Sequence, residues 1–274
     1  GSEMCIRDRG DEVDTLDSAD ALQHTRAVQL CLLIAGVAWA RELQRQGVDP
    51  QMVSGLSIGA FPAAVIAGAL DFASALRLVA LRGDLMEQAY PEGYGLTAIM
   101  GLTRPRVEAL MQGHEVYLAN LNAETQFVIA GRDEAMAEVA QLALRAGASK
   151  AQRLAVSVPS HCALLDKPAA ELAKAFAGAS LRRPWCAYLS GSTARVLWDP
   201  QRIADDLAMN MARPVHWQEA MVAADERDAR LAIEMPPGGV LTCLTRQAGW
   251  RGETIALERS GLDVARHLAQ RLSD

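Results

Sequence analysis

Gly55-Leu56-Ser57-Ile58-Gly59 has the pattern G-x-S-x-G and predicts the fold of this chain more directly than any other segment. Apolar Met52 and Val53 precede it, and an alanine-rich apolar segment over residues 60–70 follows it. A strand, a sharp turn and a helix in this order make a serine into an exposed nucleophile. Glycines beside the serine permit a tight turn and a close approach of other backbone. We therefore expect Ser57 to be a nucleophile at such a turn, the alternative being a Gly/Ser turn that only starts a helix.

Composition limits the function classes that remain. The chain has 274 residues, 50% of them hydrophobic, which is enough to bury a large core. A formal net charge of -6 without a long basic run argues against nucleic acid as a partner. The longest apolar stretch, residues 27–40, is interrupted by Gln29 and is too short to cross a membrane. Five scattered cysteines show no metal-ligand spacing, which favours reduced thiols in a cytoplasmic protein with no metal and no bound cofactor.

Hydrophobic periodicity predicts an α/β fold whose large part has a hydrolase-like parallel sheet. Helices are expected near 19–46, 72–90, 162–176, 202–211 and 240–248, and strands near 186–190, 230–235 and 254–258. Their alternation indicates a largely parallel sheet with helices on both faces. We assign residues 14–94 and 159–274 to this large α/β domain. Residues 1–13 show no usable periodicity and are interpreted as a tag or artefactual segment.

The segment 95–158 has a pattern of its own. Strands are expected at 96–102, 116–121, 126–130 and 153–158, with helices at 105–111 and 134–146. The resulting order β-α-β-β-α-β is that of a ferredoxin-like unit. The sequence therefore predicts a small ferredoxin-like subdomain inserted into the large domain.

A nucleophilic serine needs a base, and His161 is the best placed of the five histidines. The alternation of Leu154, Val156 and Val158 predicts a strand before it, and a helix follows. The carboxyl ends of strands are where open α/β sheets gather their ligands. We expect His161 to be the base, the alternative being a loop histidine held by backbone. No aspartate or glutamate between Ser57 and His161 stands out as the acid of a hydrolase triad.

Arg82 is predicted to lie on the buried face of a helix, because Leu78, Val79, Leu85 and Met86 surround it at helical spacing. An unpaired buried charge is expensive, so Arg82 needs an anion. That anion is either an internal carboxylate or the carboxylate of a substrate.

Polar side chains also cluster around a predicted hairpin turn. They are Asn120, Asn122 and Gln126. They either form the turn or line a site for a polar substrate.

Together these motifs resemble those of malonyl-CoA:acyl-carrier-protein transacylases. The resemblance runs from about residue 20 to the C-terminus, with the motifs in the family's order. It is carried by residues 55–59, 67–72, 77–86, Asn120-Leu121-Asn122, residues 126–131, Val156-Ser157-Val158-Pro159-Ser160-His161, Pro214-Val215-His216-Trp217 and residues 237–242.

The resemblance implies a reaction and a partner. Ser57 would accept malonyl from malonyl-CoA as an ester and pass it to the phosphopantetheine-type thiol of an acyl carrier protein. His161 would be the base, oriented by backbone carbonyls of the loop at residues 235–238 rather than by a carboxylate. Arg82 would hold the free carboxylate of the malonyl group.

Further site residues follow from the same resemblance. The backbone N–H of Ile58 would donate to the oxyanion, while Asn122 and Gln126 would bind substrate near the cleft. The family also begins with a strand and a Gly-Gln-Gly loop whose glutamine helps to form the oxyanion hole. Nothing before Asp20 matches that loop, and loss of one oxyanion donor costs about 10²–10³ in rate.

One departure from the family suggests a branch. Leu56 stands where the family usually has histidine. With residues 190–195 and 234–239, it makes the chain similar to the malonate decarboxylase epsilon subunit. The acceptor would then be the decarboxylase's own carrier subunit, and its other subunits would be partners. The alternatives are the transacylase of fatty-acid synthesis, a serine hydrolase and a non-catalytic subunit that binds a carrier protein.

Overall fold

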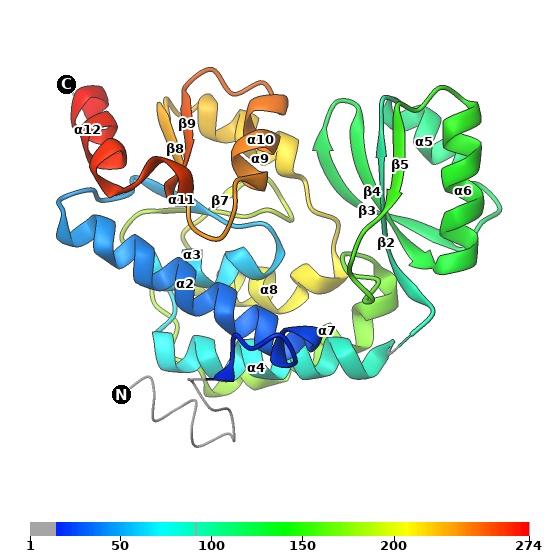
Figure 1. Cartoon of the computed structure of the whole chain (residues 1–274). Helices are drawn as coiled ribbons and strands as arrows, with labels where there is room; N and C mark the ends of the chain where they lie inside the picture. The colour runs from blue at the N-terminus through cyan, green and yellow to red at the C-terminus, as the bar shows by residue number, and fades with distance from the viewer. Residues whose placement is uncertain (1–14, 91, 274) are drawn as a thin grey trace.

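The computed structural model describes residues 15–90 and 92–273 (Figure 1). The segment 1–13 that the sequence sets apart lies outside these residues. None of the described helices is long and apolar enough to cross a membrane.

The turn at Ser57 follows the first strand of a three-stranded sheet, which lies in the large domain. Strand β1 (Met52–Ser54) pairs in parallel with β6 (Ala187–Leu189), which pairs antiparallel with β7 (Val196–Leu197). From β1 the chain turns through η3 (Ser57–Gly59) into α3 (Ala60–Ile66). The predicted strand, turn and helix are therefore present in the predicted order.

Helices surround this sheet and make the main core. They are η2 (Ala21–Gln23), α2 (Thr25–Arg45), α4 (Phe72–Ala89), η4 (Ala163–Leu165), α7 (Asp166–Ala175), η5 (Phe176–Gly178) and α8 (Pro200–Met209). The α3 helix is buried almost throughout, and its Phe61 is fully covered by residues of the same core. Because α3 has no solvent face, its apolar, alanine-rich sequence lets the neighbouring helices approach it closely.

A second, separate sheet lies toward the C-terminus. Strand β8 (Leu231–Glu234) pairs in parallel with β9 (Glu253–Ala256). Around it lie α9 (Trp217–Asp225), α10 (Val240–Gln247), α11 (Leu257–Ser260) and α12 (Leu262–Ser273). Over the described residues β8 and β9 do not pair with the sheet that holds β1, so the expectation of one continuous parallel sheet is wrong for this part of the chain.

The segment predicted as a small subdomain forms an antiparallel sheet. Its elements are β2 (Tyr94–Met100), α5 (Arg104–Met111), β3 (Val116–Ala123), β4 (Gln126–Arg132), α6 (Asp133–Arg145) and β5 (Lys150–Arg153). The strands lie in the order β3-β4-β2-β5. Figure 1 shows this unit to one side of the molecule, with α6 on its outer face. The element order is the predicted β-α-β-β-α-β, while its ferredoxin-like classification and its boundaries stay predictions.

The strand expected at 153–158 is wrong, because β5 ends at Arg153. The Arg153 guanidinium donates to four carbonyl oxygens at 2.5–3.2 Å, those of Tyr94, Leu96, Leu154 and Val156. The guanidinium thus contacts the carbonyls of Tyr94 and Leu96 on β2, the second of which also accepts from the Leu154 N–H at 2.9 Å. Gly95 makes room for it, since a Cβ there would lie 2.0 Å from Arg153 Nη2. His161 thus follows an irregular segment and not a strand.

The segment before α9 joins the small sheet to the large part. Val215 N–H donates to the Ala119 carbonyl, and Leu121 N–H donates to the Val215 carbonyl, each at 2.8 Å. His216 N–H then donates to the Gly191 carbonyl at 2.8 Å. This run of backbone bonds fixes β3 relative to the turn that follows β6.

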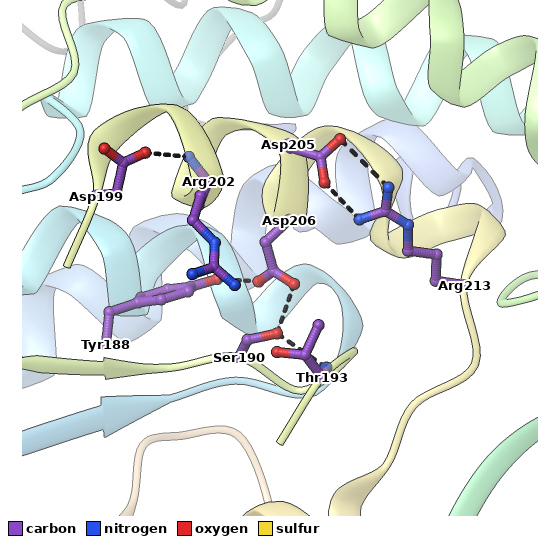
Figure 2. A network of polar contacts seen from close by, with 8 residues as sticks. All are labelled: Tyr188, Ser190, Thr193, Asp199, Arg202, Asp205, Asp206 and Arg213. Atoms are coloured by element: carbon purple, nitrogen blue, oxygen red, sulfur yellow. Dashed lines mark hydrogen bonds and ion pairs between the residues drawn. The ribbon is translucent and has the colours of Figure 1, made fainter. Parts of the chain in front are cut away.

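A buried polar network holds α8 against β6 (Figure 2). Asp206 accepts from the Tyr188 hydroxyl at 2.8 Å and from the Ser190 hydroxyl at 2.6 Å. All three side chains are buried, and burial raises the pKa of the Asp206 carboxyl. Its neighbour Asp205 points away from this network and pairs at the surface with Arg213, at 2.6 Å.

The two neighbouring aspartates should differ in how much they contribute to the free energy of unfolding. Asp206→Ala should lower the free energy of unfolding by about 2 to 4 kcal/mol, because two buried hydroxyls lose their acceptor. Asp205→Ala should change it by less than about 1 kcal/mol, since its ion pair is exposed. Urea unfolding of both variants measures the difference. Equal losses would show that the network does not hold α8 in place.

Candidate active site

The turn at Ser57 is strained in the way the G-x-S-x-G pattern predicts. Ser57 has a φ of 56°, which is uncommon for a residue other than glycine. A Cβ on Gly55 would lie 1.9 Å from the Gly59 carbonyl carbon, so the backbone of Gly55 and that of Gly59 approach each other more closely than any residue but glycine permits. Gly59 itself has helical backbone angles and open space where a Cβ would be. The turn therefore requires Gly55 but not Gly59.

His161 is held by two backbone carbonyls, one contacted by its backbone N–H and the other by its ring Nδ1. It is 2% exposed and has a φ of 67°. Its N–H donates to the Met211 carbonyl at 2.6 Å, and its Nδ1 lies 2.8 Å from the Asn210 carbonyl. Since a carbonyl only accepts, Nδ1 carries the proton and Nε2 is left as the acceptor.

The carbonyl that orients His161 is not the one expected from the sequence. It belongs to η6 (Asn210–Ala212) and not to the loop at residues 235–238. In that loop Met235 packs with the apolar residues around α11 and α12, and Gly238 N–H donates to Glu258. The loop is thus fixed to the C-terminal part, while η6 continues directly from α8 toward the serine.

Burial and the nearby Arg82 guanidinium both hold the pKa of His161 down, to about 4. Burial is the larger cause, because it disfavours the charged imidazolium. His161 is therefore neutral at pH 7, the form in which an imidazole accepts a proton.

Arg82 is 1% exposed and reaches the serine. Its Nη2 lies 3.1 Å from Ser57 Oγ and 3.0 Å from Asn210 Oδ1, and its Nη1 lies 2.5 Å from Gln29 Oε1. Burial lowers its pKa to about 9, which leaves it charged at pH 7. None of the partners found for it in the described structure is a carboxylate, and its buried Nε has no partner.

Two residues of this site were not predicted from the sequence. Asn210 contacts all three predicted groups, through its side chain to Arg82, its Nδ2 to the Ser57 carbonyl at 3.3 Å, and its backbone to His161. Gln29 comes from α2 and contacts Arg82. The only sequence signal for Gln29 is that it interrupts an apolar stretch, and Asn210 has none.

The remaining predicted residues are placed as follows. Ile58 follows the serine in η3, at the start of the α3 turn. Asn122 and Gln126 lie on β3 and β4, and their side-chain oxygens are buried without a partner. No hydrogen bond joins either of them to Ser57, His161 or Arg82 in the described structure. Over the same residues no three His, Cys, Asp or Glu side chains come together to hold a metal ion.

Comparisons with known proteins cover most of the chain. A model of the acyl transferase domain family matches residues 12–260. Malonyl CoA-acyl carrier protein transacylase of Escherichia coli (strain K12) is 37% identical over 235 residues, which are 84% of this chain and 76% of that protein.

Solved structures show the same likeness in three dimensions. The malonyl CoA-acyl carrier protein transacylase from Coxiella burnetii has a TM-score of 0.91 at 30% identity, covering 100% of this chain and 89% of that one. A malonyl-transacylase in complex with its type II polyketide synthase acyl-carrier protein has a TM-score of 0.87 at 33% identity, covering 93% and 85%. The mixed α/β fold described above is therefore the fold of these structures.

Substitution of the two glycines by alanine tests the geometry of the turn at Ser57. Gly55→Ala should destabilise the protein by about 3 kcal/mol, because the new methyl group overlaps the Gly59 backbone. Gly59→Ala should stabilise it by about 0.5 kcal/mol, because its helical backbone suits alanine. Thermal and urea unfolding measure both. An unchanged free energy of unfolding in Gly55→Ala would mean that the backbone of Gly55 does not lie this close to Gly59.

Proposed function

Because the chain belongs to the acyl transferase domain family, we propose that it transfers malonyl from malonyl-CoA to the thiol of an acyl carrier protein. The observation that carries this proposal is the contact between the buried Arg82 guanidinium and Ser57 Oγ at 3.1 Å. A nucleophile beside an uncompensated positive charge suits an acyl donor with a free carboxylate. Malonyl is such an acyl group.

The first half-reaction forms an ester on Ser57. The Ser57 hydroxyl attacks the thioester carbonyl and gives its proton to His161 Nε2. The Ile58 N–H donates to the oxyanion that develops on the carbonyl oxygen. When the intermediate collapses, the carbon–sulfur bond breaks and the CoA sulfur takes the proton from His161.

The second half-reaction reverses these steps with another thiol. The carrier thiol loses its proton to His161 and attacks the malonyl ester. The Ser57 oxygen leaves, takes the proton back, and malonyl becomes a thioester on the carrier. Arg82 holds the malonyl carboxylate through both halves, so the acyl carbon keeps its position between nucleophile and base.

The acceptor is best supported as an acyl carrier protein of the fatty-acid-synthesis type. The Escherichia coli and Coxiella burnetii relatives are named malonyl CoA-acyl carrier protein transacylases, and one structure holds a malonyl-transacylase with the acyl-carrier protein of a type II polyketide synthase. The malonate decarboxylase context expected from Leu56, residues 190–195 and residues 234–239 has no support among them. Asn122 and Gln126 remain proposed contacts of the substrate.

Intact-mass measurement after incubation with malonyl-CoA tests the proposed chemistry. We expect one malonyl group to be added to the wild-type chain and none to Ser57→Ala, whose fold should be unchanged because a smaller side chain replaces the hydroxyl. Turnover of malonyl-CoA without an adduct would indicate a serine hydrolase instead. The absence of both would indicate a subunit that only binds a carrier.

The same adduct also tests the acceptor. Offered a fatty-acid acyl carrier protein and a malonate decarboxylase carrier subunit in equal amounts, it should lose malonyl mainly to the fatty-acid carrier. Transfer mainly to the decarboxylase carrier would overturn the acceptor while leaving the ester chemistry in place.

A further inference from the structure

The partners of Arg82 among the residues that the structure describes are all electrically neutral. Gln29 Oε1 contacts one terminal nitrogen, and Asn210 Oδ1 and Ser57 Oγ contact the other. Amide and hydroxyl oxygens accept hydrogen bonds and so fix the plane of the guanidinium. They do not cancel its charge, which would require a carboxylate.

A neutral environment is an unusual solution for a buried guanidinium. Buried charges are normally paired, because an unpaired one carries the full cost of leaving water. Glutamate and aspartate have nearly the shape of Gln29 and Asn210, so packing alone does not account for the two amides. Either carboxylate would also lie where it could pair with Arg82 directly.

The two amides contact different nitrogens of Arg82 and come from different elements. Gln29 lies on α2, and its Nε2 also contacts Met86 Sδ at 3.4 Å on α4. Asn210 lies in η6, and its Nδ2 and backbone oxygen reach Ser57 and His161. The orientation of Arg82 is thus tied to the nucleophile and the base through one residue.

We propose that Gln29 and Asn210 are positioning residues that set acyl specificity. They hold the Arg82 guanidinium with neutral oxygens and so keep its charge available for the carboxylate of the acyl group. A carboxylate at either position would occupy the guanidinium and imitate a bound acyl carboxylate. The site would then lose its preference for acyl groups that carry one. This inference rests on the proposed malonyl transfer.

Asn210→Asp and Gln29→Glu test it, because each changes charge with almost no change of shape. We expect each variant to lower the ratio of Ser57 acylation rates with malonyl-CoA and acetyl-CoA by at least about tenfold. We also expect each to unfold at the wild-type temperature or above, since a buried ion pair replaces an unpaired charge. Gln141→Glu, at an exposed position of α6, adds the same charge far from the site and should change neither quantity.

Several results would overturn the inference. One is an unchanged acylation ratio in folded Asn210→Asp and Gln29→Glu. Another is an equal loss with both acyl donors, which would make the amides structural only. The inference would also be overturned if both variants unfolded at a clearly lower temperature than wild type, because a carboxylate that pairs with Arg82 should not weaken the fold.

A failure of the proposed function itself gives a different pattern. The wild-type chain would then form no malonyl ester at all. The unfolding temperature of Gln29→Glu would then decide whether neutral partners hold the charge of Arg82: a value at or above wild type supports this, and a clear decrease rejects it.

Discussion

The burial of one positive charge beside one hydroxyl is the constraint on which this site depends. Arg82 is almost fully covered, yet its hydrogen bonds go to two amides and a serine. Three consequences follow from it. The guanidinium helps to hold His161 in its neutral form, it fixes the place of Ser57 Oγ, and its charge is paired with no carboxylate of the described residues. A carboxylate in place of either amide would keep the packing of the site and cancel its net positive charge.

The fold supplies this arrangement from elements that are distant in sequence. β1 and η3 place Ser57, α4 places Arg82, and η6 places the carbonyl that orients His161. The position of η6 is fixed in turn by α8, whose Asp206 is held by hydroxyls at the end of β6 (Figure 2). Because β6 is the neighbour of β1, Ser57 and His161 are both positioned from one pair of strands.

The sequence was informative where a local motif carried the chemistry. The turn at Ser57 follows from five adjacent residues, and Arg82 follows from its apolar neighbours at helical spacing. The strand expected before His161 is absent, since β5 ends at Arg153, and the role of His161 as the base stays a prediction. Asn210 and Gln29 could not be predicted, because their contacts with Arg82 join positions 128 and 53 residues apart. The division into separate sheets was missed for the same reason, since strand pairing is non-local.

The central claim is that the uncompensated charge of Arg82 selects a carboxylate-bearing acyl group. The most direct measurement compares kcat/KM for malonyl-CoA and acetyl-CoA in the wild-type chain and in Arg82→Ala. The account predicts that malonyl transfer falls at least about a hundredfold more than acetyl transfer, because only malonyl loses a charge-assisted contact. Equal losses with both donors would contradict it and would leave Arg82 as a structural residue.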